Sequence, residues 1–227
     1  MPIFIGMKVK FCGITRVEDA HEAVSLGAWA IGLNHWPASP RRCDPGTALE
    51  ISSQFRRAAE ICGVFVNATL DEIATAVENE QLSMVQLHGD EGPAFSKEVA
   101  RRTGAKVIKA LRVRSGADVQ AAEAFRTDYH LFDAHRSGTP GGTGESFDWE
   151  LVRARNSQVP MILAGGLRPD NVAGAIEVMR PFAVDVAGGI ETSPGIKSAA
   201  LMREFAERAE ISNEPVPTTD PTAPARS

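Results

Sequence analysis

The stretch MILAGGLRPDNVAGAIEVMRPFAVDVAGG, residues 161–189, contains one complete unit of the pattern that decides the fold. It begins with the apolar run Met161–Ala164 and ends with the apolar run Ala183–Ala187, and a glycine pair follows each run. Between the two runs, Pro169–Val178 places its apolar residues at helical spacing. Two buried strands joined by a helix of this length are typical of a parallel βαβ unit with a right-handed crossover.

The same alternation of apolar run and amphipathic segment extends through most of the chain. Six more strands are expected at Lys8–Cys12, Ala28–Asn34, Ile61–Val66, Met84–His88, Lys106–Arg112 and His130–Asp133. Helices are expected at Val17–Leu26, Thr47–Ala59, Leu70–Glu80, Gly92–Arg102, Ala117–Phe125, Trp149–Arg155 and Gly195–Ala209. Together these units predict an α/β protein with a compact (β/α)8 TIM barrel. An open doubly wound sheet is the alternative, but Cys12-Gly13-Ile14-Thr15 follows the first strand in place of G-x-G-x-x-G.

Composition excludes several classes of function. The 227 residues carry a net charge of -5, which argues against a nucleic-acid partner. No apolar run approaches the ~20 residues that cross a bilayer, and the first residues do not resemble a signal peptide, so no membrane partner is expected. The three cysteines form no C-x-x-C pair, which argues against a disulfide framework and indicates a cytoplasmic location. The scattered histidines argue against a structural zinc site.

The composition changes after Ala209, where the chain ends in SNEPVPTTDPTAPARS. A segment rich in Pro, Thr and Ser cannot bury enough apolar surface to offset the entropy lost on ordering. We therefore expect a single barrel domain over residues 1–210 and a disordered tail over residues 211–227.

In a barrel, functional residues gather where the strands end and the loops to the helices begin. This rule selects Cys12, Asn34 to Arg42, Asn67, Gln86 to Asp90, Arg112, Asp133 to Gly144, Gly165-Gly166 and Asp185 to Glu191. The last two loops carry the glycine pairs Gly165-Gly166 and Gly188-Gly189, which allow the backbone N–H groups to approach an anion closely. Because many barrels bind phosphate in these loops, the pairs predict a phosphate site, with simple tight turns as the alternative.

A thiol and a carboxyl group end two of the predicted strands. Cys12 and Asp133 would lie on different sides of the barrel mouth, where they suit a general base and a general acid. Strand alternation points Lys8, Lys10 and Cys12 into the barrel interior, so a lysine below the thiol would help to stabilise a thiolate. An inert cysteine and a helix-capping aspartate are the alternative.

Two further loops carry weaker signals. The segment from His135 to Gly144 is long, polar and rich in glycine, which fits either a lid over the substrate or a plain connector. Arg41 and Arg42 follow a Ser-Pro turn and are suited to hold a carboxylate in a bidentate grip, although solvated arginines are the commoner case.

With these residues in view, the sequence resembles the phosphoribosylanthranilate isomerase family. The matching stretches run in family order from residue 8 to about residue 205. They are KFCGIT (10–15), GLN (32–34) with SPR (39–41), GVFVN (63–67), VQLHG (85–89), LFDA (131–134) with GGTG (141–144), AGGL (164–167) with PDNV (169–172), and DV (185–186) with GIE (189–191) and PG (194–195).

The resemblance implies a barrel of the ribulose-phosphate-binding type and an Amadori rearrangement, the third step of tryptophan synthesis from chorismate. Asp133 would be the general acid that opens the ribose ring, and Cys12 the general base that removes the C2′ proton. Arg41 would face the anthranilate carboxylate, and His88, Gln86, Asn34 and Asp185 would also contact the substrate. Gly165, Gly166, Gly188 and Gly189 would hold the phosphate. No metal or organic cofactor is implied, and the chain is expected to be a monomer or homodimer.

The chain departs from the family pattern at a few positions. Arg42-Cys43 follows the Ser-Pro-Arg in place of an aromatic residue, and Ala187-Gly188 stands where a Ser-Ser-Gly-like stretch is usual. These changes bear on affinity, since the expected acid and base are both present. Two alternatives stay open, a phosphosugar isomerase of histidine synthesis, which typically uses two aspartates, and a barrel that binds a phosphosugar without turnover.

Overall fold

Eight parallel strands close into a ring in the computed structural model, which describes residues 6–113, 115–133, 152, 155 and 157–211. The strands are β1 (Lys8–Cys12), β2 (Ala30–Asn34), β3 (Glu60–Phe65), β4 (Met84–Leu87), β5 (Lys106–Arg112), β6 (Tyr129–Asp133), β7 (Met161–Ala164) and β8 (Ala183–Val186). Each strand pairs with the next in sequence, and β8 pairs with β1. This arrangement confirms the predicted (β/α)8 barrel.

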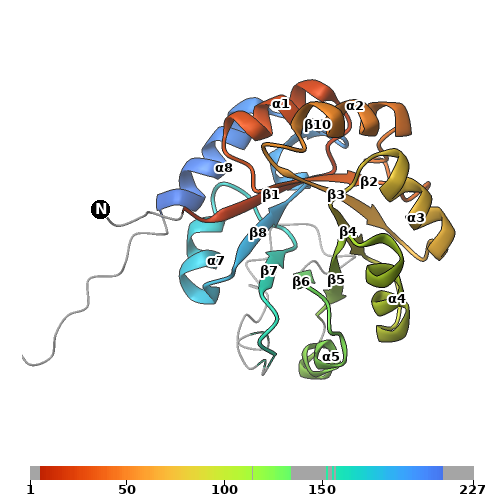
Figure 1. Ribbon diagram of the computed structural model, residues 1–227. Coiled ribbons are helices and arrows are strands. Elements are labelled where there is room, and N and C mark those ends of the chain that lie inside the picture. The colour runs from red at the N-terminus through yellow and green to blue at the C-terminus, as the bar shows by residue number, and fades with distance from the viewer. Residues whose placement is uncertain (1–5, 114, 134–151, 153–154, 156, 212–227) are drawn as a thin grey trace, which may run out of the picture.

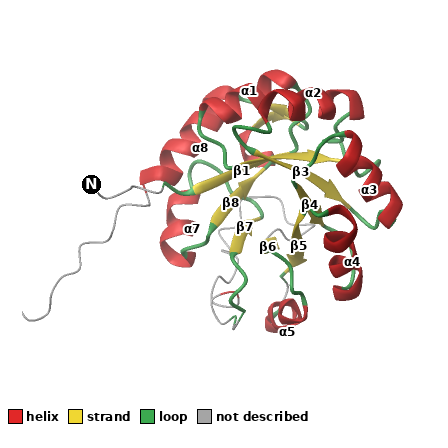
Figure 2. Ribbon diagram, viewed as in Figure 1, coloured by secondary structure: helices red, strands yellow, loops and turns green. Residues whose placement is uncertain are grey.

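The helices form an outer layer around the ring of strands (Figures 1 and 2). They are α1 (Val17–Ser25), α2 (Pro45–Phe55), α3 (Leu70–Asn79), α4 (Pro93–Thr103), α5 (Gly116–Ala121), α7 (Val172–Met179) and α8 (Ala199–Ile211). Local sequence sets several boundaries. The Asp44 side chain accepts from backbone N–H groups at the start of α2, Thr69 and Glu72 form a capping box on α3, and Gly104 ends α4 in the left-handed conformation.

Two predicted helices begin three or four residues later than expected, and α4 begins one residue later, at Pro93. The last was placed from Gly195, but α8 begins at Ala199 because β9 (Glu191–Ser193) and β10 (Ile196–Lys197) first form a small antiparallel hairpin. Gly195 has a φ of 85° and provides the turn of that hairpin. The helix expected from Pro169 begins at Val172, because the preceding residues form a turn in which Asn171 Oδ1 accepts from Arg168 N–H.

The apolar core divides into two parts that follow the alternation of the strands. One part fills the barrel interior with small and medium side chains, among them Ala30, Cys62, Met84 and Leu131. The other, larger part lies between the outer face of the strands and the helices. The barrel is therefore solid below the mouth, and the polar side chains near the strand ends lie above a packed base.

The first and last segments of the barrel are joined by more than strand pairing. In the register of β1 and β8, Lys10 lies opposite Asp185. Beyond the strands, Thr15 Oγ1 donates to the carbonyl of Gly195 at 2.6 Å, and the Lys197 N–H donates to Asp19 Oδ2 at 3.2 Å. Closure of the ring thus brings the hairpin after β8 against the loop after β1.

Several predicted segments lie outside the described residues. They are the glycine-rich loop 135–144, the tail from residue 212, and the predicted helix Trp149–Arg155 apart from Val152 and Arg155. In the described part of the chain, no helix is long and apolar enough to cross a membrane.

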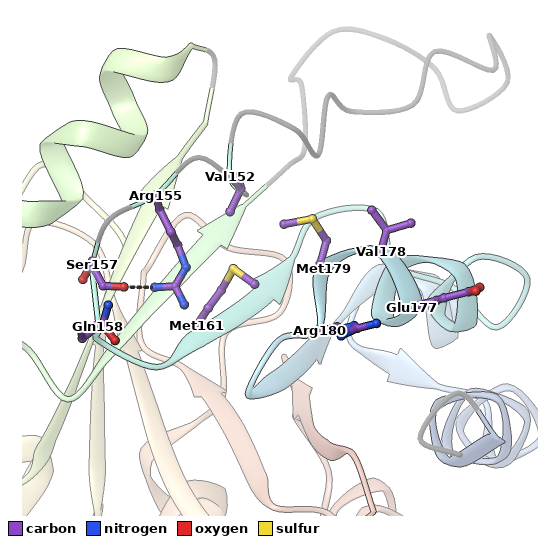
Figure 3. A pocket seen from close by; sticks show the side chains of 9 residues that line it. All are labelled: Val152, Arg155, Ser157, Gln158, Met161, Glu177, Val178, Met179 and Arg180. Carbon is purple, nitrogen blue, oxygen red and sulfur yellow. Dashed lines mark hydrogen bonds between the residues drawn. The ribbon is translucent and has the colours of Figure 1, made fainter. Parts of the chain in front are cut away.

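A cavity of about 680 Å³ lies at the end of the barrel opposite to the mouth (Figure 3). The first residue of β7, Met161, and the last turn of α7 line it, and Arg155 nearby donates to the carbonyl of Ser157. None of the predicted site residues contributes to this cavity.

Candidate active site

The thiol and the carboxyl group predicted as base and acid end strands on different sides of the mouth. Cys12 is the last residue of β1 and Asp133 the last residue of β6, and in the closed ring β7 and β8 lie between them on the shorter path. Both side chains belong to the alternating set that faces the barrel axis, as do Lys10 and Leu131 on the same strands. A small substrate in the mouth would lie between the two groups.

The Cys12 thiol lies above a buried ion pair. Lys10 Nζ donates to Asp185 Oδ1 at 2.6 Å, and the two side chains are 0% and 10% exposed. Gly32 on the neighbouring strand makes room for both the thiol and the ammonium group. A Cβ at position 32 would come within 2.8 Å of Cys12 Sγ and 3.0 Å of Lys10 Nζ. The lysine expected below the thiol is therefore present, and its charge is neutralised by Asp185.

The balance of charges keeps Cys12 protonated at rest. Burial and the Asp185 carboxylate raise the pKa of the Cys12 thiol above its ordinary value, and the cations of Lys10 and Lys197 lower it by less. For Lys10, burial alone would lower the pKa, but the Asp185 charge raises it well above its usual range. Lys10 thus lowers the pKa of the thiol, the direction expected for a lysine below it, but burial and Asp185 outweigh this effect.

The Asp133 carboxylate faces His88, which is oriented by Gln86. His88 Nε2 lies 3.4 Å from Asp133 Oδ2, and His88 Nδ1 accepts from the Gln86 amide at 2.8 Å. Because Nδ1 accepts, the proton of the neutral imidazole lies on Nε2, the nitrogen that faces Asp133. Gln86 is almost completely buried. It thus lies behind His88, although the family resemblance implied a contact with the substrate.

The loop that carries His88 is held from behind by a second buried ion pair. Lys109 Nζ lies 2.8 Å from Glu91 Oε2 and also donates to the carbonyl of Gly89. Glu91 accepts in turn from the backbone N–H groups of Asn67 and Gly89. The loops after β3 and β4 are therefore fixed to each other, which fixes the position of His88.

Arg41 makes a bidentate contact, as its sequence context predicts, but its partner is in this chain. Its Nε and Nη2 donate to the Glu191 carboxylate at 2.8 Å and 2.6 Å. Glu191 also accepts from Lys197 Nζ at 2.9 Å. The sequence predicted no role for either residue, although Glu191 lies in a stretch that matches the family and in the range 185–191 that follows the last strand. The signal that could have identified Glu191 was a carboxylate in the loop that follows the last strand of the barrel.

The two glycine pairs lie in neighbouring loops, because β7 and β8 are paired. Gly165 and Gly166 both have positive φ angles, of 92° and 67°. Gly189 lies so close to the loop after β7 that a Cβ there would overlap the carbonyl oxygen of Leu167. The four glycines therefore form one surface of exposed backbone beside the mouth, the feature on which the phosphate prediction depends.

Two predicted substrate contacts have local partners in the structure. The Asn34 side chain accepts from the backbone N–H of Trp36 at 2.8 Å, which shapes the loop after β2 that leads to Arg41. Asp185 is the partner of Lys10 and lies below the mouth. The structure thus brings Cys12, Arg41 and the glycine loops to one side of the mouth. It places His88 and Asp133 on the other side.

Fold and site together define a (β/α)8-barrel enzyme with a thiol and a carboxyl group at the carboxyl ends of its strands. The model of the N-(5'-phosphoribosyl)anthranilate (PRA) isomerase family matches residues 9–208, and the chain belongs to this family. The resemblance noted in the sequence is therefore confirmed.

Individual relatives agree with this assignment. The N-(5'-phosphoribosyl)anthranilate isomerase of Geobacter sulfurreducens is 43% identical over 204 residues, which cover 90% of this chain and 98% of the relative. The crystal structure of phosphoribosyl anthranilate isomerase from Thermotoga maritima matches with a TM-score of 0.81 at 38% identity, covering 89% and 98% of the two chains. An isomerase solved in complex with reduced 1-(o-carboxyphenylamino)-1-deoxyribulose 5-phosphate matches with a TM-score of 0.77 at 37% identity, again over 89% and 98%.

Proposed function

We propose that this chain converts N-(5-phosphoribosyl)anthranilate to 1-(2-carboxyphenylamino)-1-deoxyribulose 5-phosphate in tryptophan synthesis, with Cys12 as general base and Asp133 as general acid. The observation that carries the assignment of roles is the placement of a thiol and a carboxyl group at the ends of β1 and β6, on different sides of one mouth. Substrate and product are isomers, so the reaction moves protons and needs no redox partner.

Asp133 would act first, by donating its proton to the ribose ring oxygen. The bond between C1′ and that oxygen breaks, and the nitrogen lone pair forms a C=N bond, which gives a protonated Schiff base. His88 Nε2 lies 3.4 Å from Oδ2, so the acid would stand beside an imidazole while it donates to the sugar. Because His88 is fixed by Gln86, the acid has a defined orientation.

Cys12 would then remove the proton from C2′. The electrons of the C–H bond form a C1′–C2′ double bond and neutralise the iminium nitrogen, which gives an enolamine that tautomerises to the ketone. Because the pKa of Cys12 is raised, the thiol must lose its own proton before it acts. The thiolate that results is a stronger base than an ordinary cysteine thiolate. Lys10 and Lys197 stabilise the thiolate while it exists.

Remote parts of the substrate would supply the binding energy that orients the sugar. The glycine loops after β7 and β8 are suited to the phosphate, since backbone N–H groups there can approach an anion. Arg41 is suited to the anthranilate carboxylate through donors that Glu191 leaves free. Contacts at both ends would hold C1′ and C2′ between acid and base.

Location and assembly belong to the same proposal. A reducing cytoplasm suits the three free cysteines, all of which are buried. The phosphoribosylanthranilate isomerase of Thermotoga maritima is dimeric, and monomers generated from it have been solved. We propose a cytoplasmic monomer or homodimer that acts on this one small-molecule substrate, within a single barrel domain over residues 1–210.

The proposal is tested by turnover of phosphoribosylanthranilate generated in situ, followed through its anthranilate fluorescence. Wild type should consume the substrate, and Cys12→Ala and Asp133→Asn should each lower kcat by at least about 10²-fold, the usual scale for an acid or base. The matched control is Cys62→Ala, a buried cysteine lower in the barrel. Wild-type turnover in the Cys12 or Asp133 variant would remove that residue from the mechanism. Phosphosugar binding without any turnover by wild type would favour the non-catalytic barrel.

A further inference from the structure

We propose that Glu191 is a positioning residue that aims Arg41 at the carboxylate of an aromatic substrate, and so determines the preference for a carboxylated ring. The inference rests on the proposed function, since it assigns the preorganisation of one of that function's binding groups. Its basis is a cluster between the loops after β1, β2 and β8. In this cluster the Glu191 carboxylate contacts two cations, Arg41 and Lys197.

Glu191 occupies one edge of the Arg41 guanidinium. Nε donates to Oε1 at 2.8 Å and Nη2 donates to Oε2 at 2.6 Å. A guanidinium has five N–H donors in a planar fork, so the edge formed by Nη1 and Nη2 stays available. Within the described part of the chain, no oxygen accepts from Nη1. The geometry therefore leaves one complete bidentate edge for a second carboxylate.

Two glycines shape the passage through which the Arg41 side chain reaches this position. A Cβ at Gly13, directly after Cys12, would come within 2.8 Å of Arg41 Cδ. A Cβ at Gly188, in the proposed phosphate loop, would come within 3.2 Å of Nη2. Arg41 thus passes between the base and the phosphate loop. The two glycines thus confine the guanidinium to this side of the mouth.

Glu191 is itself held rigidly, which a positioning role requires. Its side chain is 5% exposed, and it accepts from Lys197 Nζ at 2.9 Å and from the backbone N–H of Gly195 at 3.1 Å. Lys197 in turn donates to the carbonyl of Ala187, and its side chain is 0% exposed. The hairpin of β9 and β10 therefore forms a fixed base for the carboxylate.

The charges support the same assignment. Burial alone would raise the pKa of Glu191, but the hydrogen bonds from Arg41 and Lys197 hold it below its usual value, so the group stays ionised. Without this carboxylate, the Arg41 and Lys197 cations would repel each other at close range. Arg41 would then lose its orientation, because among the described residues its side chain donates hydrogen bonds to Glu191 alone.

The test compares two ligands that differ only in the ring carboxylate. One is reduced 1-(o-carboxyphenylamino)-1-deoxyribulose 5-phosphate, and the other is the same compound with an unsubstituted phenyl ring. Dissociation constants for both are measured with wild type, Glu191→Gln and Glu191→Ala. In each variant the preference for the carboxylated ligand should fall by about tenfold or more, the scale of losing a charge-assisted hydrogen bond. Binding of the phenyl ligand should change by less than about twofold.

The matched control is Glu98→Gln, which removes the partner of the exposed residue Arg101 on α4 and should leave both dissociation constants unchanged. If Glu191→Gln does not fold, the double variant Glu191→Gln/Lys197→Met removes the unbalanced cation and gives the same readout. A merely structural Glu191 would weaken both ligands equally, and that result would overturn the proposal.

The outcomes also separate this inference from the proposed function. If wild type shows no preference for the carboxylated ligand, the role of Arg41 in the proposed function fails, and the role of Glu191 fails with it. If wild type prefers that ligand and the Glu191 variants keep the preference, only the role of Glu191 is refuted. Loss of the preference in the variants alone supports both.

Discussion

Lys10→Met should destabilise the barrel strongly, because it removes the cation from a buried ion pair. Lys10 Nζ lies 2.6 Å from Asp185 Oδ1, and the side chains are 0% and 10% exposed. Removing one partner of such a pair leaves an uncompensated buried charge and costs about 3–5 kcal/mol. In a domain of this size each kcal/mol lowers the Tm by about 2–4 °C. The Tm of Lys10→Met should therefore fall by about 6–20 °C.

The assay is thermal unfolding followed by circular dichroism and by tryptophan fluorescence. The informative partner is the double variant Lys10→Met/Asp185→Leu, which replaces both charges with apolar groups. Because a buried ion pair contributes little net stability over a packed apolar pair, the double variant should regain most of the loss. Glu98→Gln, which breaks an exposed ion pair, should leave the midpoint of unfolding unchanged.

Two results would refute this reasoning. One is a Lys10→Met protein as stable as the Glu98→Gln control. The other is a double variant less stable than Lys10→Met alone, which would show that the pair itself supplies stability. A single variant that fails to fold, beside a double variant that folds, would agree with the prediction.

Three further predictions concern the mouth. Gly189→Ala should raise the inhibition constant of inorganic phosphate about tenfold or more, because the new Cβ overlaps the Leu167 carbonyl. The control is Gly174→Ala in α7, where a Cβ meets no atom within 4 Å and the inhibition constant should stay unchanged. The active form holds one proton on Asp133 and none on Cys12, and this proton is lost when the pH passes the raised pKa of Cys12. The value of kcat/KM should therefore fall only above about pH 9, and a fall at lower pH would contradict the assignment. Gln86→Leu frees His88 and should lower kcat about fivefold, the scale of one lost hydrogen bond, and an unchanged kcat would exclude a role in positioning.

Much of the fold could be predicted because the period of the apolar residues is local information. The strands at Lys8–Cys12, Lys106–Arg112 and Met161–Ala164 were predicted with the bounds that the structure has. The alternation along the first strand also placed Lys10 in the interior correctly. The hairpin of β9 and β10 was missed, because strands this short contain no complete period and their residues are polar or turn-forming.

The candidate site was harder to predict, since its contacts join residues far apart in the chain. Arg41 and Glu191 are separated by 150 residues, and the sequence around each of them does not indicate that the two are in contact. The context of Arg41 did predict that it would grip a carboxylate in a bidentate way. The ionisation of Cys12 was also out of reach, because it depends on burial and on several charges at once. The proximity of the two glycine loops could be predicted, because consecutive strands of a parallel barrel lie next to each other.

The pairing of β1 with β8 has a consequence for the newborn chain on the ribosome. Lys10 emerges early, and its partner Asp185 follows 175 residues later. At a synthesis rate of roughly 5–20 residues per second, Asp185 is added to the chain roughly 10–35 s after Lys10. During that interval β1 has one strand edge unpaired, and the ring cannot shut. The barrel can therefore close only after most of its strands and helices have been synthesised, and until then β1 carries an unpaired edge that could pair with another chain.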